Sequence, residues 1–294
     1  MKRVLLVCNS QSGQLTRCAE AFLEPLKRAG AEVDVVVPQP KTAYPWPWGF
    51  DNFLKVFPDC VLGLAPEMNA ATLTAPHAKY DLVVVAYQVW YLAPALPIVG
   101  WLKSEAANVL NDTPVIALCA CRNMWQRAFV QVKALVAAKG GRIIDHVVRE
   151  DSGPAWATFW TTPRWVVKGD KVGSTGLFPP AGVSDEDIAT LGVPGGKVAT
   201  ALMAERLGQS VLQGSEAPIN RLFVIPELVG RFFFGVWAPL IAPSTGRVRW
   251  LLSRVFFVSL CSSLPLMVPA AVVALFIRLF ARTWFQGKVD EATA

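Results

Sequence analysis

The start of the chain carries the feature that most constrains the fold: an apolar strand that runs straight into a polar loop and then a helix. Residues 4–8 (Val-Leu-Leu-Val-Cys) form an apolar, β-branched run of the strand type. Residues 17–29 place their apolar side chains on one face of a helix. The loop between them, residues 9–16, therefore opens a helix at the end of a buried strand.

This loop has the chemistry of an anion-binding site. A helix N-terminus leaves backbone N–H groups unpaired and carries a partial positive charge. Ser10, Ser12 and Thr16 add hydroxyl donors, and Gly13 lets the backbone curl close to an anion. The loop lacks the lysine of a P-loop and the glycine spacing of a dinucleotide fingerprint. The pattern S-x-S-G-x-x-T resembles the phosphate loop of flavodoxins, which bind FMN; the alternative is an ordinary strand-to-helix turn with capping residues.

Four further strand-type runs follow within the first 150 residues, and helical patterns alternate with them. Parallel neighbouring strands need such crossovers. The alternation predicts the α/β class, with a flavodoxin-like, doubly wound parallel five-stranded sheet in the order 2-1-3-4-5 and a C-terminal hydrophobic helical extension. The runs are residues 32–38, 81–86, 114–120 and 142–148, and further helices are expected at residues 97–104 and 126–138.

Three unusual loops follow the first, third and fourth of these strands, at residues 9–16, 87–94 and 119–125. In the predicted strand order these strand ends meet at the switch point, where such sheets bind ligands. The coincidence favours FMN bound to a domain of residues 1–150, with aromatic side chains stacked on its ring; the alternative is that Trp90 and Trp125 are core residues. The cofactor-binding residues are expected to be Ser10, Gln11, Ser12, Gly13, Gln14, Leu15, Thr16, Gln88, Val89, Trp90, Tyr91, Cys121, Arg122, Asn123 and Trp125.

An aromatic insertion at residues 42–63 follows the second strand, and its prolines forbid a regular strand. Its position puts it at the carboxyl end of the sheet, on the cofactor's side. Trp46, Trp48, Phe50 and Phe53 offer large apolar faces, as a pocket for an alkyl chain would need. These four residues are predicted to bind substrate; the alternative is a loop packed on its own small core.

The chain is more apolar than an ordinary soluble protein. It is 53% hydrophobic and 17% charged, whereas the charged fraction of a typical domain is about 25%. Periodicity dissolves after residue 150, so residues 151–220 are expected to be an irregular and helical linker region. Within it, residues 184–212 look helical in two pieces, split near residues 192–196.

Residues 221–294 are predicted to be a hydrophobic, arginine-flanked, membrane-associated helical segment. Residues 255–277 lack charge and are long enough to cross a bilayer. Arginines within apolar sequence over residues 221–282 indicate a membrane surface or bilayer as partner. Two prolines leave a kinked span or a re-entrant hairpin open, and a buried helical hairpin is the alternative. With no signal peptide before the first strand, we expect a cytoplasmic protein at the inner face of the membrane.

Metal and nucleic-acid chemistry have no support in the sequence. Six cysteines follow no disulfide or zinc spacing, and Cys119 and Cys121 are one residue too close for a C-x-x-C motif. There are only two histidines, so no metal site is expected. The net charge of +6 is accompanied by no nucleic-acid-binding motif.

Four long segments resemble the family of dialkylresorcinol condensing enzymes: residues 44–48, 56–63, 86–97 and 121–125. The resemblance covers most of the chain to about residue 168. The family's name implies condensation, whereas its flavodoxin-like fold implies FMN-dependent oxidation of a dialkyl-cyclohexanedione, made by a partner ketosynthase, to a dialkylresorcinol. The lack of a nucleophilic cysteine with a partner histidine favours the redox role.

Such an oxidation removes one hydrogen as a proton and one as a hydride. Arg122, Tyr87 and His146 are candidates for a base or an oxyanion partner, and Arg122 and Tyr87 are the predicted catalytic residues. Arg122 would hold negative charge on flavin or enolate, with a surface salt bridge as its alternative. His146 fits a structural role better, and His77 is expected in a surface loop. The alternative functions are a membrane-docked electron carrier, which the positive charge disfavours, and a quinone reductase without a dedicated lipid substrate.

Overall fold

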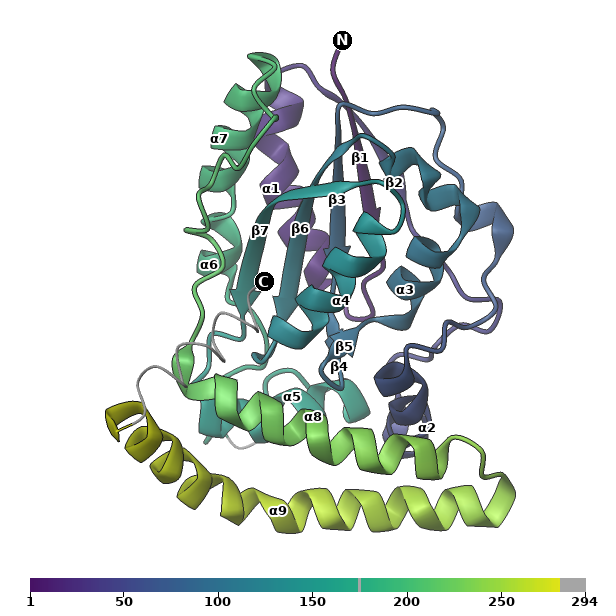
Figure 1. Ribbon diagram of the computed structural model, residues 1–294, viewed down its shortest axis with the longest axis vertical. Helices are drawn as coiled ribbons and strands as arrows, with labels where there is room; N and C mark the ends of the chain where they lie inside the picture. The colour runs from purple at the N-terminus through teal and green to yellow at the C-terminus, as the bar shows by residue number, and fades with distance from the viewer. Residues whose placement is uncertain (174–175, 281–294) are drawn as a thin grey trace.

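A five-stranded parallel sheet forms the centre of the molecule (Figure 1). The structure is a computed structural model that describes residues 1–173 and 176–280, with side chains to residue 263 in the last helix. The strand order is β2-β1-β3-β6-β7 and each neighbouring pair is parallel, so the predicted flavodoxin-like order 2-1-3-4-5 is confirmed. The strands are β1 (Arg3–Cys8), β2 (Glu32–Val36), β3 (Leu82–Tyr87), β6 (Pro114–Cys121) and β7 (Arg142–Glu150).

Helices cover both faces of the sheet, which explains why its central strands are continuous apolar runs. Even-numbered residues of β1, β3 and β6 face one helical layer, and odd-numbered residues face the other. The first layer holds α1 (Gln14–Arg28), α6 (Asp185–Ala189) and α7 (Gly192–Met203) (Figure 1). The second layer holds α3 (Leu96–Lys103), α4 (Gln126–Ala137) and the short 3-10 helix η2 (Glu105–Leu110). Another 3-10 helix, η1 (Ala70–Thr72), precedes β3.

The two helical pieces predicted for residues 184–212 form as α6 and α7, but the break comes before the glycine-rich run. Residues 192–196 make the first turns of α7. A Cβ atom on Gly195 would lie 2.2 Å from the backbone oxygen of Phe22 on α1. Glycine therefore lets α7 cross α1 closely, and the segment after residue 150 packs directly on the first βα unit.

Two helices at the carboxyl end of the sheet were not predicted. The aromatic insertion folds into α2 (Gly49–Leu62), and the irregular-looking segment after β7 contains α5 (Ala155–Lys168). Each has a proline inside it, which hides a helix in a sequence pattern. The loop after β3 also forms a small hairpin of β4 (Val89–Trp90) and β5 (Ala93–Pro94).

A long helical hairpin lies across the carboxyl end of the sheet (Figure 1). It consists of α8 (Arg221–Ile241) and α9 (Gly246–Phe280), which pack on each other and on α2. The predicted span at residues 255–277 falls within α9; its side chains beyond residue 263, like residues 281–294, lie outside the described residues. In the part of the chain that is described, α8 is the one helix long and apolar enough to cross a bilayer by length and composition.

The close approach of α7 to α1 gives a direct test of this packing. Gly195→Ala should lower the free energy of unfolding by about 1–3 kcal/mol, because the new methyl group must displace backbone. Gly196→Ala is the matched control, since its new methyl group would meet no atom of another element within 4 Å; it should be neutral or stabilising by up to about 1 kcal/mol. Urea denaturation of both variants measures the difference, and equal effects would contradict the close crossing.

Candidate functional site

A cavity of about 460 Å³ lies at the carboxyl ends of β1, β3 and β6. Its volume is in the range of small-molecule sites, and its walls are mostly apolar. The loops predicted to meet at the switch point do meet here. The predicted site residues that line the cavity are Gln11, Ser12, Gln14, Leu15, Trp46, Trp48, Phe53, Gln88, Val89, Trp90, Tyr91, Cys121, Arg122 and Asn123.

The loop that enters α1 is built to receive an anion. Gly13 has a φ of 79° and precedes the helix without any side-chain cap, so the first N–H groups of α1 keep their donor capacity. The hydroxyl of Ser10 is buried and has no hydrogen-bond partner among the described residues. A buried polar group without a partner is costly. The loop therefore offers donors that a phosphate would satisfy, and these residues fit a phosphomonoester.

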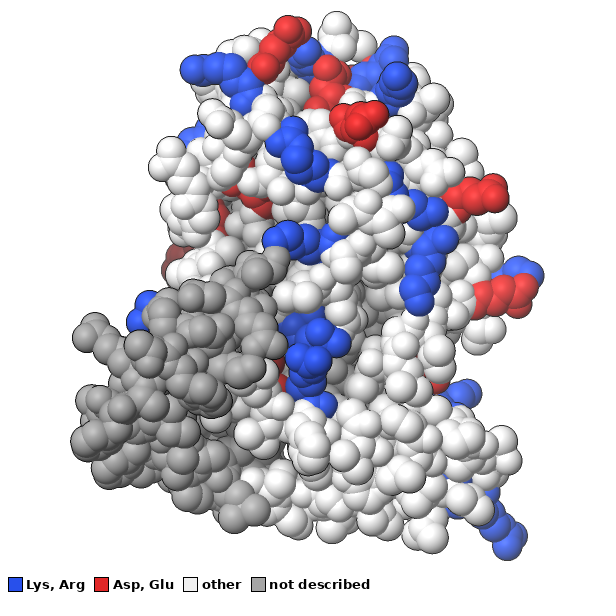
Figure 2. Space-filling model, in the orientation of Figure 1, with Lys and Arg blue, Asp and Glu red and all other residues white. Residues whose placement is uncertain are grey.

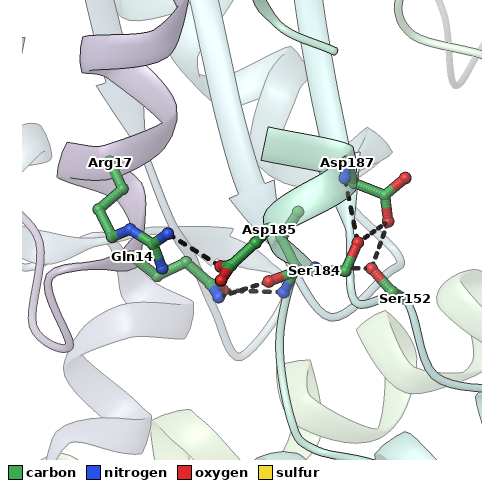
Figure 3. A network of polar contacts seen from close by, with 7 residues as sticks. Gln14, Arg17, Ser152, Ser184, Asp185 and Asp187 are labelled. Carbon is green, nitrogen blue, oxygen red and sulfur yellow. Dashed lines mark hydrogen bonds and ion pairs between the residues drawn. The ribbon is translucent and has the colours of Figure 1, made fainter. Parts of the chain in front are cut away.

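A polar network holds this loop in place (Figure 3). The Gln14 side chain donates to the Val183 carbonyl at 2.9 Å and accepts from the Val183 N–H at 3.0 Å. Arg17 pairs with Asp185 at 2.8 Å, at the first turn of α6. Ser184 caps α6, its hydroxyl accepting from the Asp187 N–H. The start of α1 is thus fixed to the chain segment that follows residue 180.

The aromatic insertion lines the cavity and also packs on its own core. Trp48 is buried, and its indole N–H donates to the Gln11 side chain at 3.1 Å. It meets Trp90 edge-on with ring centroids 4.7 Å apart, and Phe53 packs beside it. Trp48 and Phe53 therefore line the cavity and also form part of a small local core, so the two alternatives for this segment do not exclude each other. Phe50 is an exception: it is exposed and packs against Phe257 of α9, away from the cavity.

The hairpin after β3 presents Trp90 and Tyr91 to the cavity. Tyr91 and Leu92 have φ values of 52° and 63°, as both central residues of a type I′ turn require. Non-glycine residues seldom adopt this conformation, and strain of this kind gathers at functional sites. The Tyr91 hydroxyl donates to the Phe53 carbonyl at 2.6 Å, which ties this turn to α2.

Arg122 supplies the positive charge of the cavity. Its guanidinium donates to the Asn123 side chain at 3.1 Å and lies 5.1 Å from the ring centre of Phe159. Burial lowers the pKa of Arg122, while the nearby Asp151 carboxylate opposes that shift. Asp151 also lines the cavity and accepts the N–H of Gly182 at 2.7 Å. A partly buried arginine in an apolar cavity interacts more strongly with an anion than an arginine in bulk water does.

Two predicted residues, Tyr87 and Trp125, lie on the other side of the sheet. Tyr87 is fully buried beneath α4, and its hydroxyl lies 3.0 Å from Nε2 of His146. Trp125 meets the same histidine edge-on and donates to Glu150 at 3.0 Å. Residue parity explains this: Ala86 faces α1, so Tyr87 must face α4. Neither side chain can touch a ligand in the cavity.

The remaining predicted positions frame the loop without lining the cavity. Gly13 makes the backbone turn of the loop, and the hydroxyl of Ser10 is buried beneath it. Thr16 is partly buried, within hydrogen-bonding reach of the Cys8 thiol. Burial raises the pKa of that thiol to about 12, so Cys8 stays protonated at neutral pH. The loop's contribution is therefore hydroxyls and amides.

Sequence reasoning missed the residues that α5 and α8 bring to the cavity. Phe159 and Thr162 come from α5, and Val229 and Phe233 from α8. The main sequence signal for α8 was its apolar composition, which indicated membrane association. The acid within that apolar run was a second signal, because Glu227 is buried and its carboxylate accepts the N–H of Arg127 at 2.6 Å.

No protein-family model and no curated protein matches the chain. Among solved structures, it is similar to a flavoprotein in complex with FMN from Lactobacillus acidophilus NCFM, with 18% identity, 50% of this chain and 92% of that chain covered, and a TM-score of 0.40. It is also similar to a flavodoxin from the domain Archaea, with 10% identity, 69% of this chain and 99% of that chain covered, and a TM-score of 0.38. A third similar structure is the azoreductase AzrA, with 15% identity, 67% of this chain and 99% of that chain covered, and a TM-score of 0.37. The strand order defines the fold independently of these distant similarities.

The buried His146 should make stability depend on pH. Burial lowers its pKa to about 3, so the unfolded chain binds this proton near pH 6.5 while the folded chain does not. The contribution of His146 to the free energy of unfolding should therefore fall as the pH drops below about 6.5, by up to about 1.4 kcal/mol per pH unit, while Glu227, whose pKa is raised to about 7, contributes in the opposite sense. Between about pH 6.5 and 4.5 the slope of His146→Gln should differ from that of wild type by this amount, and the slope of His77→Gln should match wild type. Identical slopes in wild type and His146→Gln would contradict the burial of a neutral histidine.

Proposed function

We propose that the chain is an FMN-dependent oxidoreductase that acts on a lipophilic substrate. The observation that carries this proposal is the direct continuity between the loop that enters α1 and a large apolar cavity. The loop suits a charged phosphate group, and the cavity suits an apolar molecule next to a planar ring. Both lie at the switch point, where sheets of this order bind their ligands.

FMN fits the residues on both sides of the cavity. The hydroxyls of Ser10 and Ser12, with the N–H groups at the start of α1, would hold its phosphate. The hairpin at residues 88–91 and the loop at residues 121–123 would flank its ring, with Trp90 as an aromatic surface. When bound, FMN supplies hydride and electron transfer, which this chain's own side chains cannot.

Coverage of the cavity favours an enzyme over an electron carrier. A carrier exchanges electrons through an exposed cofactor edge, whereas here α5 and α8 close over the apolar part of the cavity. Pro226, Phe233 and Phe234 of α8 have no evident use in electron transfer to a protein. They supply the apolar walls that a bound substrate needs in order to be held and shielded from water.

At the finer level, the substrate we propose is a dialkyl-cyclohexanedione, in line with the family resemblance, and the product a dialkylresorcinol. Aromatising the ring removes two hydrogens, one as a proton that passes to solvent and one as a hydride, for which bound FMN would be the acceptor. Arg122 would hold the enolate oxygen, because it is the cation that lines the cavity among the described residues. The alkyl chains would lie between α2, α5 and α8. A ketosynthase that makes the dione is the proposed partner.

The phosphate site is tested by removing its hydroxyls. Ser10→Ala with Ser12→Ala should raise the Kd for FMN about a hundredfold or more, since each hydrogen bond to a charged acceptor contributes roughly 1.5–3 kcal/mol. Thr200→Ala, which removes a hydroxyl on the outer side of α7, should leave the Kd unchanged. Fluorescence titration of FMN measures both, and unchanged affinity in the double variant would sink the assignment.

The substrate side is tested at the cavity mouth. Val229 lines the cavity and is also half-exposed, so Val229→Phe can fill the mouth without straining the core. Activity on long-chain diones should fall more than on short-chain diones, because each buried CH₂ contributes about 0.8 kcal/mol. Val236→Phe, exposed on the same helix and outside the cavity, is the control. Bleaching of the flavin absorbance by each dione is the measurement, and bleaching by none of them, with FMN bound, would favour the electron carrier.

A further inference from the structure

The outer face of the α8–α9 hairpin is a continuous apolar surface. Exposed apolar side chains recur at helical spacing along α8 and along the part of α9 whose side chains are described, to residue 263, and Phe232 is 77% exposed. In Figure 2 the surface over α8 and the start of α9 is mostly uncharged, while acidic residues gather toward the opposite end of the molecule. A patch of this extent marks an interaction site. Its members include Leu222, Phe232, Leu240, Val248, Trp250 and Val258.

The inner face of the same hairpin is anchored to the globular domain. Glu227 of α8 is 5% exposed, and its carboxylate accepts the N–H of Arg127 in the first turn of α4. Phe256 of α9 stacks on Phe57 of α2, with ring centroids 3.9 Å apart. If α8 left this position to cross a bilayer, the first turn of α4 would lose its acceptor and the cavity would lose a wall. The hairpin is therefore held flat against the domain.

The charges of the hairpin are positive and sit beside its apolar face. Arg221, Arg231 and Arg247 are exposed, while Arg254 lies over the ring of Trp250 at 4.5 Å and is paired with Asp51 of α2. Over residues 221–263 the sequence has one acid, Glu227, and it is buried. Apolar side chains flanked by arginines and an exposed tryptophan are typical of helices that lie in the interface of an anionic membrane.

We infer that the α8–α9 hairpin docks on an anionic lipid bilayer, with both helices lying in the plane of the interface. The occupant is an anionic membrane surface, because exposed arginines beside an apolar helix face match the charged head groups and the acyl chains of such a membrane. Docking puts α8, one helix thick, between the lipid and the cavity. The inference goes beyond the proposed function and needs only the hairpin.

Sedimentation of the full-length protein with vesicles tests the docking. The protein should pellet with phosphatidylglycerol vesicles and bind phosphatidylcholine vesicles at least about tenfold more weakly, because anionic lipid attracts the arginines. Raised salt should reduce the difference. Flavin absorbance is read in the same samples, so that loss of FMN with intact vesicle binding would count against the proposed function alone. Protein that stays in solution with both kinds of vesicle would overturn the docking.

Matched variants locate the docking face. Phe232→Glu with Val258→Glu should weaken binding to phosphatidylglycerol vesicles about tenfold or more, since both side chains lie on the outer face. Val193→Glu, at a valine of α7 that is 64% exposed, should bind like wild type. If the double variant loses its circular dichroism, Arg231→Gln with Arg247→Gln takes its place and should also weaken binding. The inference would be overturned if the outer-face variant and Val193→Glu bound vesicles equally. It would also be overturned if the wild type did not bind vesicles but formed a dimer in light scattering that the outer-face variant dissociates.

Discussion

Everything in this structure follows from the way a parallel sheet gathers the loops after its strands at one edge. Five parallel strands put the loops after β1, β3 and β6 side by side, at an edge where the hydrogen-bond ladders of the central sheet have ended. Their backbone groups need other partners or a ligand. The loop entering α1 is shaped to bind an anion, and α2, α5 and α8 cover the rest of that edge. The cavity is what remains between the anion loop and this cover.

One buried carboxylate fixes the cover in place. Trp125 precedes α4 without capping it, and Glu227 reaches across from α8 to accept an N–H of its first turn. Burial raises the pKa of Glu227 to about 7, although the hydrogen bond from Arg127 opposes this shift. An acid near a helix N-terminus is also favoured by the helix dipole. A single acid in a long apolar segment therefore fixes the position of the hairpin relative to α4 and the sheet.

The sequence predicted the sheet and the position of the polar loop before α1, because both depend on local patterns. Uninterrupted apolar runs identify buried parallel strands, and hydroxyls before a helix identify its N-terminus. The face of the sheet on which a residue lies was harder to predict, because it depends on the residue at which the strand ends. Tyr87 and Trp125 looked like cavity residues by sequence position, yet they turn toward α4. α5 was hidden because Pro163 interrupts its pattern, and only tertiary packing turns that segment into a cavity wall.

The hairpin shows why hydropathy alone could not separate its roles. Mean hydropathy averages over the residues of both faces of a helix, so α8 qualifies as a candidate membrane span by this measure. Its inner face, with Glu227, Phe233 and Phe234, packs on the rest of the protein. Its outer face, with Phe232 and Leu240, is exposed. To span a bilayer, α8 would have to give up the hydrogen bond between Glu227 and the first turn of α4 and carry this acid into hydrocarbon, which is costly. On the proposed docking, α8 would close the cavity with one face and contact lipid with the other, so a lipophilic substrate would have its source and its binding site on opposite sides of one helix.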